Sequence, residues 1–170
     1  MLVKEIMSTN IRTATPDSSI SEVAMTMCFN KISGMPVVDD DYNIVGIISE
    51  KDILRAMYPN VNDYMGNGME VGRVDFEALE SEYRDLINLR VGDLMTKNVF
   101  AVLPESPILR AVSVMCVNMI RRIPVARGGK LLGIVSMGDV HKAIFQKNIS
   151  NNIQQDIVVK SVPQRPAAIG

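Results

Sequence analysis

Two segments of the sequence place a serine and an aspartate three residues apart, each directly after an apolar run. The first holds Ser49 and Asp52, and the second holds Ser136 and Asp139. Residues three apart face the same side of a helix. An aspartate carboxylate can accept hydrogen bonds from two vicinal hydroxyls, and a serine hydroxyl with free helix N–H groups suits an anion such as phosphate. The pattern therefore indicates sites for a ligand that carries hydroxyl and phosphate groups.

A structural interpretation competes with this one. Serine is a preferred helix N-cap, and aspartate in a first turn complements the helix dipole. In a single copy this would be the preferred explanation. However, the segments Gly46–Asp52 and Gly133–Asp139 keep the same glycine, serine and aspartate. The duplication favours a duplicated ligand site.

These segments belong to a longer internal repeat. Residues 3–57 and 91–145 follow one pattern at an offset of 88 residues, which falls to 87 after a deletion in a turn. Without gaps, residues 3–39 and 91–127 share twelve identities in 37 positions. A unit of about 55 residues cannot easily bury its apolar face alone. We expect the two copies to pack together and to form a cleft with two related sites.

Two arginines distinguish the copies. Arg121 and Arg122 directly precede an Ile-Pro dipeptide, where copy one has Ser33 and Gly34 before its proline. Arginines bind phosphate through parallel, charge-assisted hydrogen bonds, so copy two could carry a phosphate clamp that copy one lacks. Exposed arginines at a strand edge explain these residues equally well.

Each copy is predicted to contain a strand, a helix, two strands and a second helix. The first helix begins at an N-cap serine, Ser18 or Ser19 in copy one and Ser106 in copy two, and ends near Asn30 or Asn118. The other predicted elements are second helices from Glu50 and Met137, and strands over residues 11–14, 35–38, 44–48, 99–102, 123–126 and 131–135.

Two regions lie outside the repeats. Residues 58–90 form an insert, predicted as a loop over 58–72 and an amphipathic helix over 75–89. Residues 146–170 are rich in Asn, Gln and Pro without a clear period, so we expect an extended or disordered tail.

Composition limits the partners. The formal net charge is −1 and no long basic run occurs, which argues against nucleic acid or an anionic membrane as the main partner. The apolar runs are too short to span a bilayer, and the first residues do not resemble a signal peptide. We expect a cytoplasmic protein without membrane insertion.

The residues give little support for catalysis or metal binding. Cys28 and Cys116 lie at equivalent positions on apolar helix faces and are predicted to be buried packing residues, with a redox pair as the alternative. His141 is the single histidine and is predicted to be a surface residue. Asp39–Asp41 fall at a turn, where aspartate is common. We therefore expect no catalytic residue, no metal site and no enzymatic activity.

The repeated pattern resembles a tandem pair of CBS (cystathionine-beta-synthase) domains, the Bateman module, as in small stand-alone prokaryotic CBS-domain proteins. The two Gly-x-x-Ser-x-x-Asp segments are its most specific part. The other residues that carry the resemblance are Met7-Ser8, Met95-Thr96, Met35-Pro36-Val37 and Ile123-Pro124-Val125.

The resemblance implies an α+β fold of two pseudo-symmetric β-α-β-β-α repeats, residues 1–57 and 91–145, packed sheet to sheet with a helical insert between them. It also implies a homodimer of such pairs. The clefts would take an adenosine compound, namely AMP, ADP, ATP or S-adenosylmethionine, with no covalent cofactor and an unknown effector protein as partner.

The family pattern also implies the site residues. The aspartate would hold the ribose hydroxyls, the serine would lie near ribose or phosphate, and the base would stack on the other copy. One site would join Asp139, Ser136 and Arg122 with Met7, Ser8, Ile11, Gly34 and Met35. The other would join Asp52 and Ser49 with Met95, Thr96, Val99, Ile123 and Pro124. Arg121 and Pro36 are also expected among the ligand-binding residues. Because copy one lacks the arginines, we expect unequal sites, with the Asp139 site occupied more readily.

Two functions follow as hypotheses. The first is a regulatory module whose dimer changes conformation when an adenine nucleotide binds one state more tightly than the other. The alternative is a structural or protein-interaction module whose clefts stay empty. A nucleotide-processing enzyme would need a base or a metal that the sequence does not offer.

Overall fold

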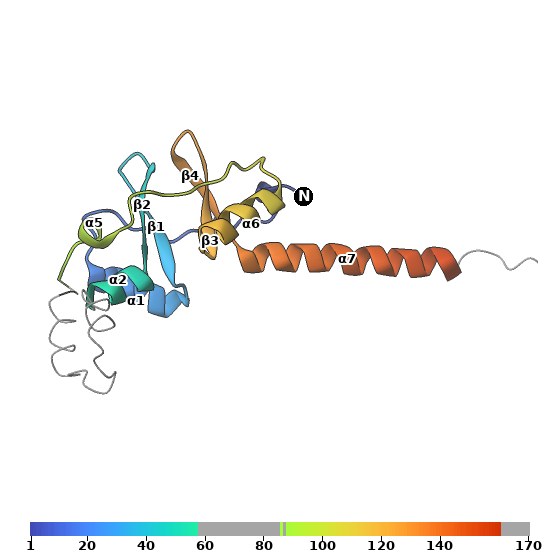
Figure 1. Ribbon diagram of the computed structural model, residues 1–170, viewed down its shortest axis with the longest axis horizontal. Helices are drawn as coiled ribbons and strands as arrows, with labels where there is room; N and C mark the ends of the chain where they lie inside the picture. Colours follow the sequence, from blue (N-terminus) through green and yellow to red (C-terminus); the bar gives the residue numbers. More distant parts are fainter. Residues whose placement is uncertain (58–85, 87, 161–170) are drawn as a thin grey trace, which may run out of the picture.

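The computed structural model describes residues 1–57, 86 and 88–160 (Figure 1). The predicted loop and most of the predicted helix of the insert lie outside these residues. Copy one contains α1 (Ile20–Asn30), β1 (Gly34–Val38), β2 (Ile44–Ser49) and α2 (Glu50–Met57), preceded by a short 3-10 helix, η1 (Val3–Glu5). Copy two contains α6 (Ile108–Val117), β3 (Arg122–Arg127), β4 (Lys130–Ser136) and α7 (Met137–Lys160), preceded by a short helix, α5 (Val91–Leu94).

Each copy is built around an antiparallel hairpin. In β1–β2, Pro36 lies opposite Ile47, and in β3–β4, Pro124 lies opposite Ile134. The register shifts at the equivalent place in both hairpins, directly after Val37 and after Val125. This confirms the predicted α+β class, with two repeats that each combine a two-stranded sheet with helices.

The first helix of copy one begins as predicted, whereas that of copy two does not. The Ser19 hydroxyl accepts a hydrogen bond from the Glu22 amide (3.2 Å), and the Glu22 carboxylate accepts one from the Ser19 amide (3.2 Å). This reciprocal pair is a capping box. The prediction of Ser106 as N-cap is wrong, because Pro107 takes that position and the Ser106 amide donates to Leu103 in the preceding turn.

The predicted first strands over residues 11–14 and 99–102 are wrong in extent. A single residue of each is bridged, Ala14 in copy one and Val102 in copy two, both parallel to the strand that follows the first helix. The segment that precedes Ala14 pairs with the other copy instead, because Ser8 forms a bridge to β4. The chain must cross between the copies within a few residues and has no length left for a strand.

The N-terminal segment of each copy packs into the core of the other. The Val3 amide donates to the Ser106 carbonyl (2.9 Å), and the Val91 amide donates to the Ser18 carbonyl (2.9 Å). Neither copy can therefore complete its core without the other. One core consists of Val3, Val102, Ile108, Ala111, Met115, Ile123, Val125, Val135 and Val140. The other consists of Ala14, Ile20, Val23, Met27, Met35, Val37, Ile48, Ile53 and Val91.

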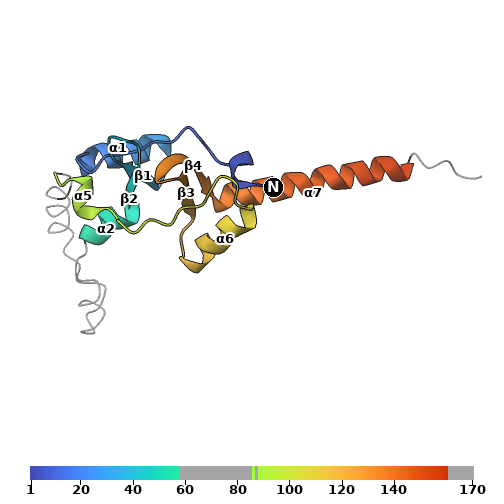
Figure 2. The same ribbon diagram turned by 90° about the horizontal axis from the view of Figure 1, so that it is seen from above.

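The tips of the two hairpins also join the copies. Figure 2 shows the two hairpins side by side. The Ile44 amide donates to the Gly129 carbonyl (2.9 Å), and the Leu131 amide donates to the Tyr42 carbonyl (3.1 Å). Gly129 has a φ of 86°, which a residue with a Cβ rarely adopts. The Gly-Gly turn thus lets the second hairpin meet the first.

The predicted turn at Asp39–Asp41 is confirmed. The Asp39 carboxylate accepts hydrogen bonds from the Asn43 amide (2.8 Å) and the Asn43 side chain (3.0 Å). These bonds favour the ionised form and hold the pKa of Asp39 below its ordinary value of 3.8.

We predict that Asn43→Ala raises the pKa of Asp39 toward 3.8. Because the folded-state pKa is the lower one, ionised Asp39 stabilises the fold above the unfolded pKa, and this contribution is lost as pH falls through the folded pKa. Carboxyl NMR titration of Asp39 measures the shift directly. Asp41→Asn keeps both Asn43 hydrogen bonds and serves as the control. An Asp39 titration that is unchanged by Asn43→Ala would contradict this account.

The prediction that both cysteines are buried is wrong. Cys28 and Cys116 are exposed free thiols. The residue before each, Met27 or Met115, occupies the buried face of its helix. The next residue is rotated by about 100°, so both thiols turn away from the cores onto equivalent outer faces.

The predicted tail is wrong up to Lys160, because α7 continues to that residue. No proline or glycine occurs between Asp139 and Lys160 to end the helix. Figures 1 and 2 show α7 leaving the body of the molecule. Val140 in its second turn is buried, whereas Ile144, Phe145 and Ile149 are exposed. Residues 161–170 lie outside the described part of the chain.

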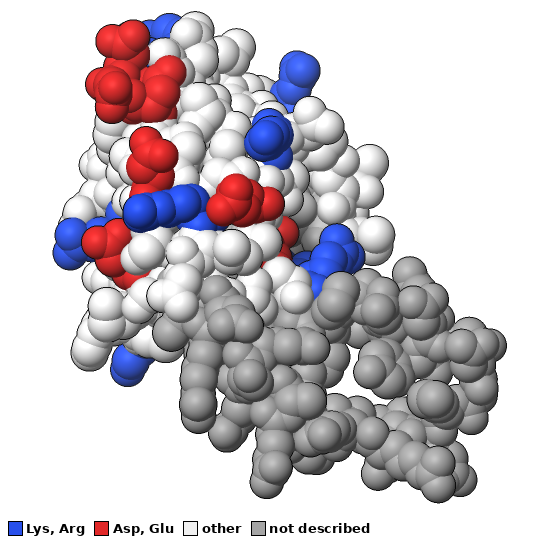
Figure 3. Space-filling model, turned by 90° about the vertical axis from the view of Figure 1, so that its left-hand side faces the viewer, with Lys and Arg blue, Asp and Glu red and all other residues white. Residues whose placement is uncertain are grey.

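The described surface mixes charges of both signs. On the face in Figure 3, lysine and arginine side chains lie among aspartate and glutamate side chains. Elsewhere on the surface, Arg127 at the end of β3 forms an ion pair with Glu105. Among the described residues, no helix is long and apolar enough to cross a membrane.

Candidate functional site

Both serine–aspartate pairs form closed hydrogen-bonded turns at the start of the second helices. The Asp52 Oδ2 atom accepts from the Ser49 amide (2.8 Å) and hydroxyl (2.5 Å). The Asp139 Oδ2 atom accepts from the Ser136 amide (2.8 Å) and hydroxyl (2.6 Å). The structural interpretation is thus correct for this oxygen. All four residues are half-buried, and the second carboxylate oxygen of each aspartate decides what else the turn can bind.

That second oxygen differs between the copies. Asp52 Oδ1 accepts a hydrogen bond from the Thr96 hydroxyl (3.3 Å). Ser8 is the equivalent of Thr96 in the repeat, and no hydrogen bond joins Ser8 to Asp139 among the described residues. Among the described residues no hydrogen bond to Asp139 Oδ1 is found, whereas Asp52 Oδ1 would have to give up the Thr96 hydroxyl to accept one from a ligand.

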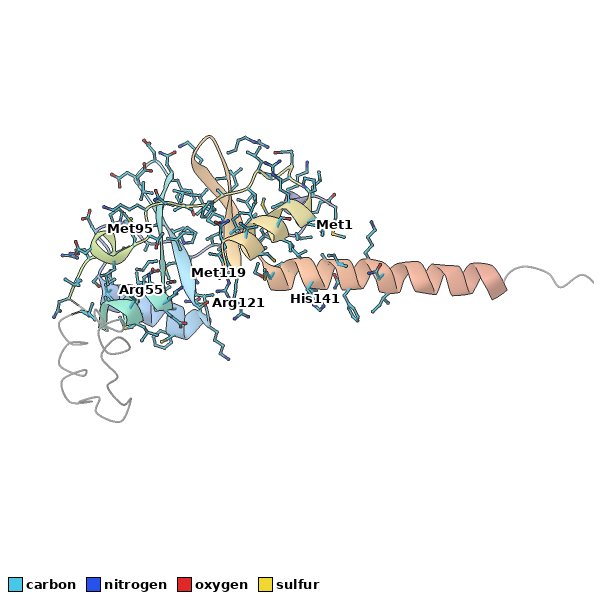
Figure 4. All side chains as sticks on the ribbon, viewed as in Figure 1. Met1, Arg55, Met95, Met119, Arg121 and His141 are labelled. Atoms are coloured by element: carbon cyan, nitrogen blue, oxygen red, sulfur yellow. The ribbon has the colours of Figure 1, made fainter. Side chains whose placement is uncertain are left out.

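The segments that precede the first helices lie on the opposite copy's motif strand. Ser8 exchanges two backbone hydrogen bonds with Ile134 (both 2.9 Å), and Thr96 exchanges two with Ile47 (2.9 and 3.0 Å). The structure therefore brings Met7-Ser8 to the Asp139 motif and Met95-Thr96 to the Asp52 motif, the association that the family resemblance implies. Figure 4 shows Met95 on this crossing segment.

The residues before the prolines cap the second helices. The Ser33 carbonyl accepts from the Glu50 amide (3.2 Å), and the Arg121 carbonyl accepts from the Met137 amide (3.0 Å). Figure 4 shows Arg121 close to the start of α7. Ser33 and Arg121 are equivalent in the repeat, so the serine–glycine and arginine–arginine pairs stand at the same place in the two sites.

Arg122 connects the two copies. Its backbone pairs with Ser136, beside the Asp139 motif. Its Nη1 atom donates to the Ser33 hydroxyl (2.6 Å), at the head of α2 in copy one. The sequence predicts Arg122 for the Asp139 site alone, whereas the guanidinium lies toward the Asp52 motif. Ser33 is the residue that sequence reasoning missed, although its equivalence with Arg121 was a usable signal.

Several predicted ligand contacts have no free side chain. Met35 and Ile123 are core residues, and Pro36 and Pro124 are fully buried, so the side chains of these four are taken up by packing. Ile11, Gly34 and Val99 are half-buried.

A cavity of about 300 Å³ lies beside the hairpin tips rather than at the motifs. Among the predicted residues it includes only Val99. It is lined by Ile44, Val99, Ala101, Val102, Leu103, Ala126, Gly128 and Gly129.

The described residues offer no metal centre. No three His, Cys, Asp or Glu side chains among them lie together to hold an ion. His141 is exposed, as predicted, and its ring stacks on that of Phe145 with centroids 6.4 Å apart.

Comparison with known proteins decides the family. The CBS domain model matches residues 3–59 and again residues 91–146. The chain belongs to the CBS domain family. An uncharacterised protein of Methanocaldococcus jannaschii is 32% identical over 156 residues, a match that covers 85% of this chain and 92% of the relative. The two copies are therefore CBS repeats, and together they form a CBS pair.

Two solved CBS pairs are similar in structure. CBSX2 in complex with AMP has a TM-score of 0.66 at 27% identity, over 86% of this chain and 98% of that one; CBSX2 is a CBS domain-containing protein of Arabidopsis thaliana. The CBS pair of protein MJ0100, in complex with 5′-methylthioadenosine and S-adenosylmethionine, has a TM-score of 0.64 at 25% identity, over 85% and 99%. Three curated relatives, full-length CBSX2 among them, are longer, and the chain spans 46%, 58% and 60% of their lengths.

Proposed function

We propose that this CBS pair is a regulatory module that binds an adenosine compound, namely AMP, ADP, ATP or S-adenosylmethionine, and catalyses no reaction. The observation that carries the proposal is that Asp139 Oδ1 accepts no hydrogen bond from the described residues, in a turn whose other oxygen is fixed by Ser136. A fixed carboxylate with one free oxygen suits the vicinal hydroxyls of a ribose. The AMP and S-adenosylmethionine complexes of the similar CBS pairs support an adenosine ligand.

The Asp139 site is the one that we expect to fill first. The ribose would bind Asp139, and Met7 and Ser8 would border it from the crossing segment, which lies against Ile134. At the second site the ligand must replace the Thr96 hydroxyl on Asp52. Giving up this exposed hydrogen bond of 3.3 Å costs about 1 kcal/mol unless the ligand restores it. The two sites would therefore differ in affinity even for an uncharged adenosine compound.

A homodimer is part of the proposal. Phe29 of α1 and Val117 of α6 occupy equivalent positions and are 83% and 81% exposed. Met25, Leu109 and Met119 add further exposed apolar side chains to the same helices or their ends. Apolar patches of this kind mark interfaces in proteins. We expect two copies to cover these faces, and ligand binding to shift the dimer between two states for an effector protein to read.

The alternative is an interaction module with empty clefts. The observation that favours it is that capping hydrogen bonds account for both serines and for one oxygen of each aspartate without any ligand. In that case the adenosine compounds would have no effect on the stability of the chain.

Thermal unfolding of the purified chain with AMP, ADP, ATP and S-adenosylmethionine tests the proposal. A ligand at about 100 times its Kd stabilises the folded state by about 2.7 kcal/mol, which raises the midpoint of a chain of this length by about 5–10 °C. We predict such a rise for at least one compound, and a clearly smaller rise in Asp139→Ala, in which only the Asp52 cleft remains. Each variant is compared with its own ligand-free midpoint, because removing the cap lowers that midpoint too.

Asp93→Ala is the matched control. Asp93 caps the short helix α5 through the Arg90 amide (3.1 Å) and lies outside the predicted sites. It should lose some stability and keep the full ligand response. No midpoint rise with any of the compounds would reject the sensor and favour the empty-cleft module.

A further inference from the structure

We propose that the guanidinium of Arg122 is a single phosphate-binding group shared by the two clefts of the CBS pair. A phosphorylated adenosine compound in one cleft would then lower the affinity of the other cleft for a second one. This inference rests on the proposed function, because it concerns how the same two sites share one positive charge.

The backbone of Arg122 belongs to the Asp139 cleft. Arg122 pairs with Ser136 across the β3–β4 hairpin, and the preceding carbonyl, of Arg121, caps α7. A phosphate placed at the start of α7 would therefore lie close to the root of the Arg122 side chain. A turn about its side-chain bonds would direct the guanidinium to this cleft.

The side chain of Arg122 reaches the Asp52 cleft instead. Its Nη1 atom donates to the Ser33 hydroxyl (2.6 Å), and the Ser33 carbonyl caps α2. Gly34, the next residue, pairs with Ser49 of the copy-one motif. The guanidinium thus stands at the head of α2, where the phosphate of a nucleotide held by Asp52 would lie. Ser33 holds it there through an uncharged hydroxyl acceptor, which an anionic phosphate can replace with a stronger pair between two charged groups.

The repeat offers no reciprocal cation. The position equivalent to Arg122 in copy one is Gly34, and that equivalent to Arg121 is Ser33. The two-fold pattern of the fold therefore has two clefts but one arginine at the junction. Lys51, which is exposed beside Asp52, and exposed Arg121 are the other basic residues of these segments.

The Arg122 guanidinium must turn about its side-chain bonds to pass from the Asp52 cleft to the Asp139 cleft, so in either position it serves one phosphate and leaves the other. When one phosphate takes Arg122, the other cleft must bind its ligand without that charge. Coupling between sites is reciprocal, so filling either cleft with a phosphorylated ligand weakens the other by the same factor. An uncharged adenosine has no phosphate to compete with and would not be coupled in this way.

Calorimetric titration of the full chain with AMP and with adenosine tests the sharing. In Asp139→Ala only the Asp52 cleft remains, and in Asp52→Ala only the Asp139 cleft remains. We expect AMP to bind about tenfold or more tightly than adenosine in both variants. Adding Arg122→Gln to either single-cleft variant should remove the advantage of AMP over adenosine. In the unaltered chain, the second AMP should bind about tenfold or more weakly than the first. For adenosine, the two affinities should differ only by the intrinsic difference between the two clefts.

Arg127→Gln is the matched control. Arg127 lies at the far end of β3 and pairs with Glu105, so its loss should leave the AMP advantage unchanged. An advantage of AMP over adenosine that is present in only one single-cleft variant would overturn the sharing, as would an advantage that survives Arg122→Gln. Loss of the advantage in one cleft through Arg121→Gln alone would overturn it too. These three results leave the proposed function standing, whereas a chain that binds neither AMP nor adenosine rejects both.

Discussion

Val3→Asp is expected to destabilise the whole chain by about 4 kcal/mol or more, although Val3 lies in a short segment at the N-terminus. Val3 has no exposed surface and packs in the core that copy two otherwise forms. An aspartate there would be a buried charge without a partner. Because this core also holds β3, β4 and the start of α7, we expect both copies to unfold together at a lower urea concentration. Circular dichroism during urea unfolding measures the loss.

Asn10→Asp is the control for this prediction. It adds the same charge to the same segment at an exposed position, and such surface changes usually stay within about 0.5 kcal/mol. Val91→Asp is the symmetric test, because Val91 is equally buried in the core of copy one. If Val3→Asp lowered stability no more than Asn10→Asp does, the exchange of N-terminal segments would be wrong.

The internal repeat made the hairpins and the starts of the second helices predictable. The same apolar periodicity occurs in both copies, and a proline marks the same strand position in each. The residues that open the second helices, Glu50 and Met137, are confirmed. The N-terminal segments are different, because nothing in the spacing of Met7 or Met95 reveals which copy they join. That association came from family resemblance, and its physical basis is a contact across the two copies.

The errors share a cause: a local sequence pattern does not determine which other segments pack around a residue in the fold. Cys28 and Cys116 fit an apolar stripe, yet each lies about 100° from the buried methionine before it. The segment before Ala14 has strand composition, but its length is used in crossing between the copies. The Asn, Gln and Pro content of residues 146–170 and their lack of a clear period predicted an extended or disordered tail, whereas α7 meets no proline or glycine before Lys160.

The chemistry of the site was predictable in part. Serine and aspartate three residues apart indicated both a cap and a ligand site, and the structure assigns one carboxylate oxygen to the cap. The difference between Asp52 and Asp139 in their second oxygen depends on Thr96, which comes from the other copy. The direction of the Arg122 side chain likewise depends on Ser33 across the junction. Such contacts between distant segments follow only from the folded arrangement.

Gly133→Val is expected to cost about 3 kcal/mol, because the crossing segment passes directly over this glycine. A Cβ at Gly133 would lie 2.6 Å from the Met7 Sδ atom and 3.1 Å from the Ser8 carbonyl. The thioether can move, whereas the Ser8 backbone is held by two hydrogen bonds to Ile134. Valine should therefore push the segment off β4, and the same change should weaken ligand binding at the Asp139 site.

A second substitution shows which methionine opposes the valine. Met7→Ala removes the thioether above Gly133 and should recover about 1 kcal/mol of the loss, as expected for residues in direct contact. Met95→Ala makes the same chemical change above Gly46, where a Cβ would lie 2.5 Å from the Met95 Sδ atom, and should recover nothing. Urea unfolding of the single and double variants gives both coupling energies. Equal recovery by the two methionine variants would mean that the crossing segments do not select their partner copies, and the positions of Ser8 and Thr96 beside the two aspartates would then lose their structural basis.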